Sequence, residues 1–450
     1  MDPSQIDLAL ARIRTALEAG EVQAAIDTLT DLHPVDRADA FSDLDDKDQA
    51  ALLPRLDLEA TADLLEELED EQAAAVAETF GTEQLAEVLD EMEPDEAADV
   101  LGDIPASQAE EALAEMEDAS NVLPLLPFDD ETAGGRMTTS FITLPLGTSA
   151  LDAIQTLRRV EPSSETPYYL YVDDEADRLI GIVGIRDLVI AAPETKIESF
   201  MDPEVIFAHT QEDQEEVALR MARYDLAAVP VVDDRGAVVG VITHDDVMDV
   251  LEEEATEDIY RLANVPDHEL SIHSPIRQTI RKRIPWLYLS AITALFAAWV
   301  VSRFESLIAE VAILAVFLSV VAGLGGNTAT QSLAMIVRAF ALGEIDLRRA
   351  WRTVIKEGLI GLVAGLLVGT AVGLAVWLWQ DNMVLGAVLG LALIGNMLVA
   401  GFVGALIPIS LRALKLDPAL ASSVLVTTVT DSVGFALFLS LSALALSNLQ

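Results

Sequence analysis

The chain has no cysteine among its 450 residues, which excludes disulfides, thiolate metal sites and a cysteine nucleophile. Basic residues are also scarce, with 27 Lys and Arg against 75 Asp and Glu, so the formal net charge is −48. Because nucleic-acid binding depends on Lys and Arg at the phosphates, we exclude nucleic acid as a partner. Two interpretations of the acidity stay open: attraction of divalent cations, and the solubility of a protein from a salt-loving source.

The N-terminal residues lack a basic stretch followed by an apolar run, so no signal peptide is expected there. Charge and hydrophobicity are segregated along the chain: the first 131 residues are strongly acidic, whereas residues 285–450 are mostly Leu, Ala, Val, Ile and Gly. We therefore expect a cytoplasmic first part, up to about residue 280, followed by a membrane domain.

Five apolar segments after residue 284 are long enough to cross a bilayer, at about 285–302, 307–337, 354–379, 383–411 and 418–446. Lys and Arg cluster before the first segment, between the second and third, and between the fourth and fifth. The positive-inside rule then predicts a multi-pass protein of the plasma membrane with its N-terminus in the cytoplasm and its C-terminus outside.

Asp431 lies near the middle of the fifth segment, in SSVLVTTVTDSVG. An Asp at that depth costs about 2.5–3.5 kcal/mol on insertion scales, so it is expected to face a cavity or a partner. Ser423, Thr427 and Asp431 are four residues apart and share one helix face. A hydrogen bond from Asp431 to a neighbouring helix is the alternative, structural interpretation.

The second segment contains GLGGNTATQS, residues 323–332, where the glycines predict a break in the helix. Asn327, with Thr330 and Gln331, would add neutral oxygens there, and Asn396 of the fourth segment would add another. A site built only of oxygens suits a hard cation, and Mg²⁺, which sheds its water reluctantly, could pass in hydrated form.

Residues 1–131 are predicted to form short amphipathic helices in a stack, because apolar residues recur at helical spacing between turn residues. Residues 132–256 contain an internal repeat, and each copy is predicted to run strand, helix, strand, turn, strand, helix. This repeat resembles a tandem pair of CBS domains, a regulatory module that often binds adenine nucleotides.

In the CBS family a hydroxyl residue three positions before an Asp holds the ribose and phosphate. Thr243 and Asp246 match this in the second copy, whereas the first has Gly184 before Asp187. The resemblance implies a possible ATP site, with Tyr168, Tyr169, Arg186 and Asp187 as its residues. Leu226, where an aromatic residue would fit better, argues against it, and no P-loop is present for hydrolysis.

After the repeat, carboxylates at 246, 249, 253 and 257 recur at helical spacing, and a divalent ion would relieve their repulsion. Taken in order, these features resemble the MgtE family of magnesium channels over the whole chain, most specifically in GGNTATQS, GALIP, LDPAL and VTTVTDSVG. The expected fold is an α-helical membrane protein with five transmembrane helices, an α-helical N domain (1–131), an α/β tandem CBS pair (132–256), a connecting helix (257–284) and a pore domain (285–450).

The resemblance implies a homodimer in the lipid bilayer, with the pore on its two-fold axis and Asp431 binding Mg²⁺, to which Asn327 and Thr427 would contribute oxygens. It also implies regulatory Mg²⁺ ions that hold the channel closed when cytosolic Mg²⁺ is high. Their implied ligands are Asp90, Asp213, Glu215, Asp225, Asp246, Asp249, Glu254 and Glu257. A cation carrier or exchanger and a membrane-bound sensor without transport stay open; an enzyme is not expected.

Overall fold

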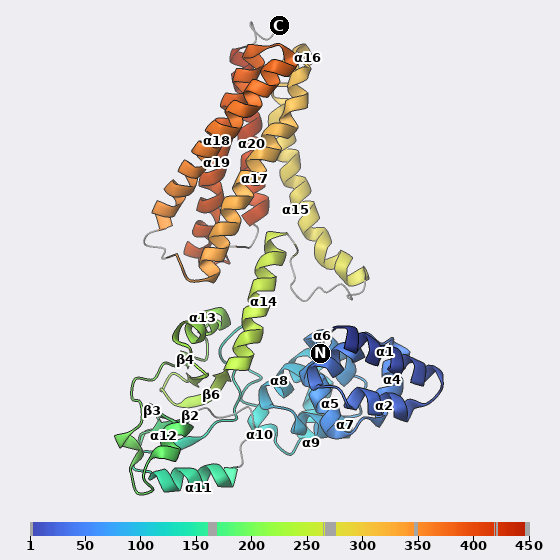
Figure 1. Ribbon diagram of the computed structural model, residues 1–450, viewed down its shortest axis with the longest axis vertical. Helices are drawn as coiled ribbons and strands as arrows, with labels where there is room; N and C mark the ends of the chain where they lie inside the picture. Colours follow the sequence, from blue (N-terminus) through green and yellow to red (C-terminus); the bar gives the residue numbers. More distant parts are fainter. Residues whose placement is uncertain are drawn as a thin grey trace. The chain divides into compact units, whose positions relative to one another are not determined.

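The computed structural model describes residues 3–160, 169–263, 265, 276–345, 350–417, 419 and 422–445. The chain divides into two compact units, Met1–Val250 and Leu251–Gln450, here called unit 1 and unit 2. Figure 1 shows the helical and mixed parts of unit 1 and the long helices of unit 2.

The first part of unit 1 is a stack of short helices. Their bounds are α1 Pro3–Glu18, α2 Val22–Thr30, α3 Pro34–Ser42, α4 Asp46–Leu52, α5 Leu58–Glu66, α6 Asp70–Ala77, α7 Thr82–Glu91, α8 Pro94–Asp103, α9 Ala106–Glu115 and α10 Ala119–Val122. Proline at the first position starts α3 and α8, where its missing N–H costs nothing. From α1 to α9 every second helix packs together, as α1 with α3, α3 with α5, α5 with α7 and α7 with α9, which confirms the predicted helical stack.

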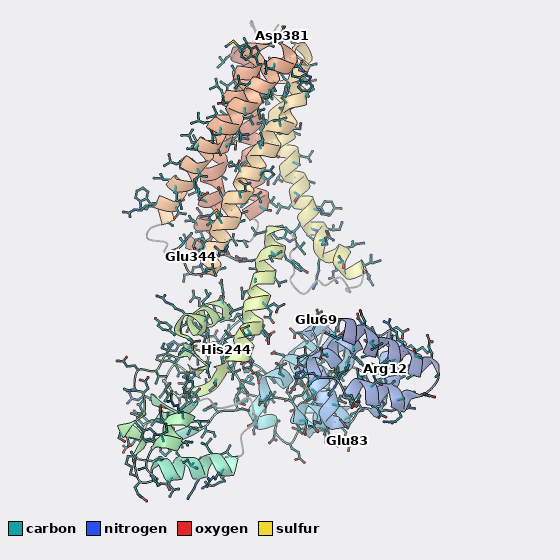
Figure 2. All side chains as sticks on the ribbon, viewed as in Figure 1. Arg12, Glu69, Glu83, His244, Glu344 and Asp381 are labelled. Atoms are coloured by element: carbon teal, nitrogen blue, oxygen red, sulfur yellow. The ribbon has the colours of Figure 1, made fainter. Side chains whose placement is uncertain are left out.

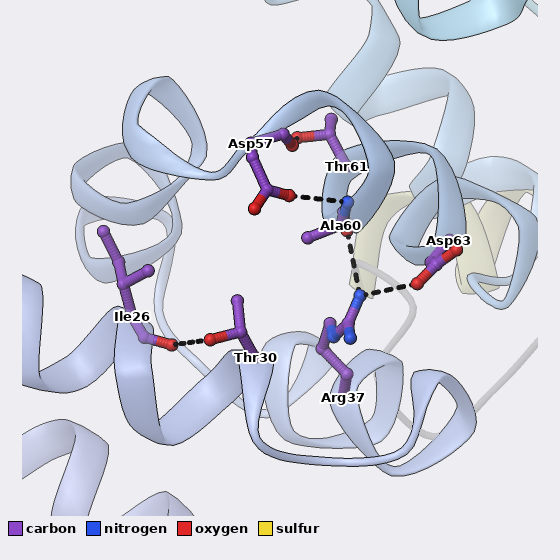
Figure 3. Close-up of polar contacts among 7 residues, drawn as sticks. All are labelled: Ile26, Thr30, Arg37, Asp57, Ala60, Thr61 and Asp63. Carbon is purple, nitrogen blue, oxygen red and sulfur yellow. Dashed lines mark hydrogen bonds and ion pairs between the residues drawn. The ribbon is translucent and has the colours of Figure 1, made fainter. Parts of the chain in front are cut away.

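Polar contacts join successive turns of this stack (Figure 3). The Asp57 carboxylate caps α5 by accepting a hydrogen bond of 2.9 Å from the Ala60 N–H. Arg37, only 6% exposed, donates from Nη1 to the Ala60 carbonyl at 3.3 Å and to Asp63 Oδ2 at 3.0 Å. A buried guanidinium is thus paired, and it ties α3 to α5.

The second part of unit 1 is the internal repeat. Its first copy contains β1 Thr143–Pro145, α11 Ala150–Val160, β2 Tyr169–Asp173, β3 Leu179–Gly184 and α12 Ile185–Ile190. The second contains β4 Ala208–His209, α13 Gln214–Tyr224, β5 Ala228–Val232, β6 Val238–Thr243 and α14 His244–Leu262. In each copy the first strand pairs parallel to the second and the second pairs antiparallel to the third, so the predicted repeat is confirmed.

Unit 2 contains five helices long and apolar enough to span a membrane, within the residues described. They are α15 Ile276–Ser302, α17 Ile313–Ala341, α18 Ala350–Gln380, α19 Met383–Ala413 and α20 Ser422–Leu444; a short α16, Glu305–Glu310, precedes α17. The five predicted spans are therefore confirmed. Glu344 and Asp381, which follow α17 and α18, lie at opposite ends of the bundle (Figure 2).

Glycines bring α18 and α19 close together. A Cβ on Gly361 would lie 2.2 Å from the Met397 carbonyl oxygen, and one on Gly373 would lie 2.6 Å from the Gly386 carbonyl oxygen. Small residues allow such approach of backbones in a membrane, where no hydrophobic effect drives helices together. By contrast α15 is scarcely buried within the chain: only 6% of the residues in its apolar 18-residue stretch are buried, so it adds little to this packing.

The predicted break at GLGGNTATQS is wrong, because α17 is a continuous helix from Ile313 to Ala341. Its glycines keep their helical hydrogen bonds and serve instead as places of close contact or open surface. Gly325 is buried against Asn396, whereas a Cβ on Gly323 or Gly326 would meet nothing within 4 Å.

Candidate functional site

The intramembrane polar residues of α20 lie on one face. Thr427 is exposed and Asp431 is half-buried one turn later, as the spacing of four predicted. The Thr427 hydroxyl donates to the Ser423 carbonyl oxygen at 2.8 Å, which leaves its lone pairs available as acceptors. The face thus offers a carboxylate and a hydroxyl oxygen one helical turn apart.

A second polar face runs along α17, where Asn327, Thr330 and Gln331 are all exposed in the single chain. They are spaced by three and four residues, so they also form one stripe. α17 and α20 pack directly against each other. The two stripes therefore belong to neighbouring helices of one bundle, and both are open on the outside of the single-chain bundle.

Asn396 does not join this open surface, which corrects the expectation of a further ion-facing oxygen. It is 0% exposed and donates from Nδ2 to the Val321 carbonyl oxygen of α17 at 3.0 Å. The side chain lies inside the bundle because Gly325 and Gly434 leave room for it.

One intramembrane carboxylate was missed by the sequence analysis. Glu357 of α18 is 4% exposed, and its Oε2 accepts a hydrogen bond of 2.9 Å from the Ser332 hydroxyl of α17. Together with Asp431, it is one of two acidic residues in the described membrane spans. Its position just before a long apolar run, in IKEGLIGL, was the signal that could have found it.

In unit 1, carboxylates gather around the first turns of α14. Asp246 accepts hydrogen bonds from the Thr243 N–H at 2.9 Å and the Thr243 hydroxyl at 2.7 Å. Burial nevertheless raises the pKa of Asp246 above its ordinary value, against these hydrogen bonds. Asp249, one turn later, is close enough to Glu67 to raise the pKa of that carboxyl, for which burial is the larger cause.

Three carboxylates of α8 are buried and were not predicted, and two of them, Asp95 and Glu96, lie near Asp246. Burial, and then the charge of Asp246, raise the pKa of Asp95 well above its ordinary range. Burial, and then Asp95, do the same for Glu96. Burial raises the pKa of Asp99 to about 7, although Arg136 acts in the opposite direction. Sequence periodicity could not find these residues, because their burial, and the proximity of Asp95 and Glu96 to α14, arise only from folding.

The other implied regulatory ligands of unit 1 lie at separate places. Asp90 of α7 accepts hydrogen bonds from the N–H groups of Glu117 and Asp118, at 2.8 and 3.0 Å. Asp213 caps α13 by accepting from the Glu215 N–H at 3.0 Å, and Asp225 ends that helix with a φ of 54°. These residues therefore have structural roles as helix caps and loop anchors, beside any contact with an ion.

In unit 2, the end of α14 forms a second group of charges. Arg261 is ion-paired with Glu257, one turn earlier, and with Asp417, which lies between α19 and α20. Between them in sequence, Asp258 has its pKa raised to about 7 by burial and by the charges of Asp417 and Glu254. Glu254 and Glu257 were predicted, whereas Asp258, Arg261 and Asp417 were missed.

Among the described residues, no three carboxylate or histidine side chains converge at the spacing of a preformed metal site. What the structure does show is crowding of like charges with raised pKa values, and a buried Asp95 Oδ1 without a hydrogen-bond partner in the described part of the chain. Oxygen donors of this kind fit Mg²⁺, which binds through one or two carboxylates and keeps several waters.

The structure describes three of the four residues that were expected to bind a nucleotide. Tyr168 lies outside the described residues. Tyr169 is half-buried at the start of β2, and Arg186 and Asp187 are exposed in the first turn of α12. β2 and β3 are paired with Tyr169 opposite Gly184, so the tyrosine lies beside the start of α12.

Three family models match the chain. They are described as the MgtE intracellular N domain, over residues 32–131, the CBS domain, over residues 133–194 and 197–253, and the divalent cation transporter MgtE, over residues 318–441.

Similar proteins include the magnesium transporter MgtE of Thermus thermophilus, 40% identical over 329 residues, which are 73% of each chain. That of Enterococcus faecalis is 36% identical over 328 residues, covering 73% of this chain and 72% of that one. Among solved structures, the cytosolic domain of the Mg²⁺ channel MgtE in complex with ATP is 33% identical and has a TM-score of 0.51; the match covers 54% of this chain and 99% of that chain.

Proposed function

Because the chain belongs to the MgtE family, whose members are transporters of divalent cations rather than enzymes, we propose that it is a Mg²⁺ channel for magnesium uptake, closed by cytosolic Mg²⁺. The observation that carries the proposal is that two neighbouring helices of unit 2 each carry an open polar stripe, with Asp431 and Thr427 on α20 and Asn327 on α17. Carboxylate, hydroxyl and amide oxygens of this kind hold a hydrated Mg²⁺ through its waters.

The proposed channel is a homodimer. A single chain would expose the carboxylate of Asp431 and the side chain of Asn327 to lipid, at a cost that membrane proteins avoid by facing such groups to an interior. A second copy related by a two-fold axis would cover this face and line the other wall of a pore with the same residues. With the N domain inside and five spans, the C-terminus is then outside.

The proposed gate is the set of carboxylates on α14 and its neighbours. Without Mg²⁺, ionised groups such as Asp246 and Asp249 repel the acidic residues near them in unit 1, Asp95 and Glu67. Mg²⁺ would neutralise them and favour the compact, closed state, because a ligand shifts the equilibrium towards the state that it binds more tightly. α14 links the two units as one helix, so its first turns can act as sensor and its last turns as connection to the pore.

Flux through purified protein in proteoliposomes tests the pore assignment. Asp431→Asn is expected to abolish Mg²⁺ uptake. Asp381→Asn is the matched control, because Asp381 lies outside the membrane spans and has a left-handed backbone conformation that Asn also adopts. Unchanged uptake by Asp431→Asn would remove Asp431 from the pore. Saturable, coupled flux without single-channel currents would favour a carrier, and no uptake by the wild-type protein would favour a sensor.

The second part of the proposal is that the CBS pair binds ATP. The cytosolic domain of the Mg²⁺ channel MgtE that matches 54% of this chain was crystallised with ATP. In this chain Tyr169, Arg186 and Asp187 offer an aromatic ring, a cation and an acceptor at one end of the first repeat. The role would be regulatory, because the sequence has no P-loop for hydrolysis.

A further inference from the structure

We propose that Asn396 and Glu357 are positioning residues that fix the rotation of α17 about its axis and so hold Asn327 on the open face. This inference rests on the proposed function, in which that face lines the pore. Neither residue touches the ion; each acts through a hydrogen bond to α17, one before and one after Asn327 along the helix.

The first contact is the Asn396 side chain of α19. Nδ2 donates to the Val321 carbonyl oxygen, and Oδ1 is buried without a hydrogen-bond partner in the described part of the chain. An amide with an unpaired oxygen in an apolar bundle does not serve stability well, because an unpaired buried acceptor is costly. Its presence therefore calls for another role, and specifying one arrangement of helices is a role that buried polar groups fulfil.

Asn396 is packed closely against a glycine of α17 and a glycine of α20. A Cβ on Gly325 of α17 would lie 2.1 Å from Asn396 Nδ2, and one on Gly434 of α20 would lie 2.5 Å from the same atom. If α20 turned by one residue, the side chain of Val433 or Phe435 would replace Gly434 against the amide. In α17 one direction of turning would bring Leu324 there and the other Gly326, so in that second direction only the lost hydrogen bond to the Val321 carbonyl oxygen opposes the rotation. The amide therefore packs against both α17 and α20, the two helices that carry Asn327 and Asp431.

The second contact is between Ser332 of α17 and Glu357 of α18. Both residues are 4% exposed, and the hydroxyl donates to Oε2 at 2.9 Å. A carboxyl in a membrane span is expected to have a specific partner, and turning α17 would take this donor away. Glu357 therefore favours the same rotation of α17 as Asn396 does.

Helix geometry shows that both contacts act on one face. At about 100° and 1.5 Å per residue, Val321 and Ser332 differ by only about 20° in direction and lie about 16 Å apart along the axis. Gly325 and Thr328, between them, are buried on this same face. Asn327 points about 120° away from it and is exposed. Two anchors on one side of α17 thus determine what the helix presents on the other side.

The chain has no cysteine, so single cysteines can report the rotation of α17 without background. Asn327→Cys would report the open face and Thr328→Cys the buried face, each by its rate of reaction with a membrane-impermeant thiol reagent in proteoliposomes. In the otherwise wild-type protein, Cys at 327 should react and Cys at 328 should react slowly, through rare openings.

Asn396→Ala and Ser332→Ala should each raise the reaction rate at position 328 by about three-fold, the average effect of one hydrogen bond between membrane helices. Ser319→Ala is the control, because Ser319 is exposed on the same helix and, in the described part of the chain, its hydroxyl donates within its own turn, to the Val316 carbonyl oxygen. Glu357→Gln keeps an acceptor oxygen for Ser332 and should leave the rate unchanged, whereas Glu357→Ala should raise it.

Unchanged reaction at position 328 in both Asn396→Ala and Ser332→Ala would overturn the positioning role. No reaction at position 327 in the otherwise wild-type protein would instead count against the proposed pore face, so the two failures are distinguishable. If Asn396→Ala does not assemble, the Asn396→Ala and Gly325→Ala double variant fills the vacated space with a methyl group while still lacking the hydrogen bond, and the same rate criterion applies to it.

Discussion

Arg261, in the last turn of α14, forms an ion pair with Asp417, five residues before the first residue of α20, and also pairs with Glu257. One guanidinium thus neutralises carboxylates of the connecting helix and of the segment that leads into the helix with Asp431. In the proposed channel, the guanidinium of Arg261 neutralises these two carboxylates permanently, as Mg²⁺ would neutralise the other α14 carboxylates when it binds.

The Arg261–Asp417 pair should stabilise the end of α14 modestly, and the effects of substituting its two residues should not be additive. Arg261→Gln and Asp417→Asn are each expected to raise the rate of protease cleavage near the end of α14 in the absence of Mg²⁺, by about two- to five-fold, since a partly exposed ion pair is worth up to about 1 kcal/mol. The double variant should be no worse than either single one. Additive effects of the two substitutions would contradict a direct interaction.

Unit 1 should lose stability as pH rises in the absence of Mg²⁺. Burial raises the pKa of Asp99 from 3.8 to about 7, so between these values the folded unit holds a proton that the unfolded chain has released. Stability therefore falls as pH rises through about 4 to 7, the reverse of an ordinary paired carboxylate. Asp95, Glu96 and Asp246 shift in the same direction.

Thermal unfolding of the full chain in detergent at a series of pH values measures this effect. Asp99→Asn should reduce the dependence of Tm on pH and raise Tm at pH 8, and Mg²⁺ should raise Tm of the wild-type protein most at high pH. Glu87→Gln, an exposed residue of α7 in the same unit, is the control. If Tm of Asp99→Asn depended on pH as Tm of the wild-type protein does, the pKa of the Asp99 carboxyl would not be raised.

The close approach of α18 and α19 should tolerate no added methyl groups. Gly361→Ala places a Cβ 2.2 Å from the Met397 carbonyl oxygen, a backbone atom that cannot move aside, so we expect a loss of about 1–3 kcal/mol and a lower Tm in detergent. Val363→Leu, two residues away and 56% exposed, should leave Tm unchanged. Equal stability of the two variants would mean that the glycine contact is not close in the protein.

ATP should bind the full chain without being hydrolysed. Arg186→Ala is expected to weaken binding by about ten-fold or more, because a hydrogen bond to a charged group contributes about 1.5–3 kcal/mol. Arg235→Gln, on the exposed turn between β5 and β6, is the control for loss of a positive charge. Titration with a fluorescent ATP analogue measures both; equal affinities would place the nucleotide elsewhere or show that none binds.

Periodicity and composition alone predicted the elements of this protein. Apolar runs of membrane length predicted all five spans, and the internal repeat of residues 132–256 predicted the order of strands and helices in both copies, because these patterns depend on local sequence. Asp431 was identifiable for the same reason: a carboxylate in an apolar run is unusual whatever surrounds it.

Only the tertiary structure decided which polar residues lie together. It places Asp95 and Glu96 of α8 in the surroundings of Asp246, more than 140 residues away in sequence, and it buries Glu357 against Ser332. It also shows that the glycines of α17 preserve the helix and admit Asn396, whereas the sequence predicted a break. A sequence records which residues are small, charged or apolar, but burial and electrostatic proximity depend on the packing of distant segments.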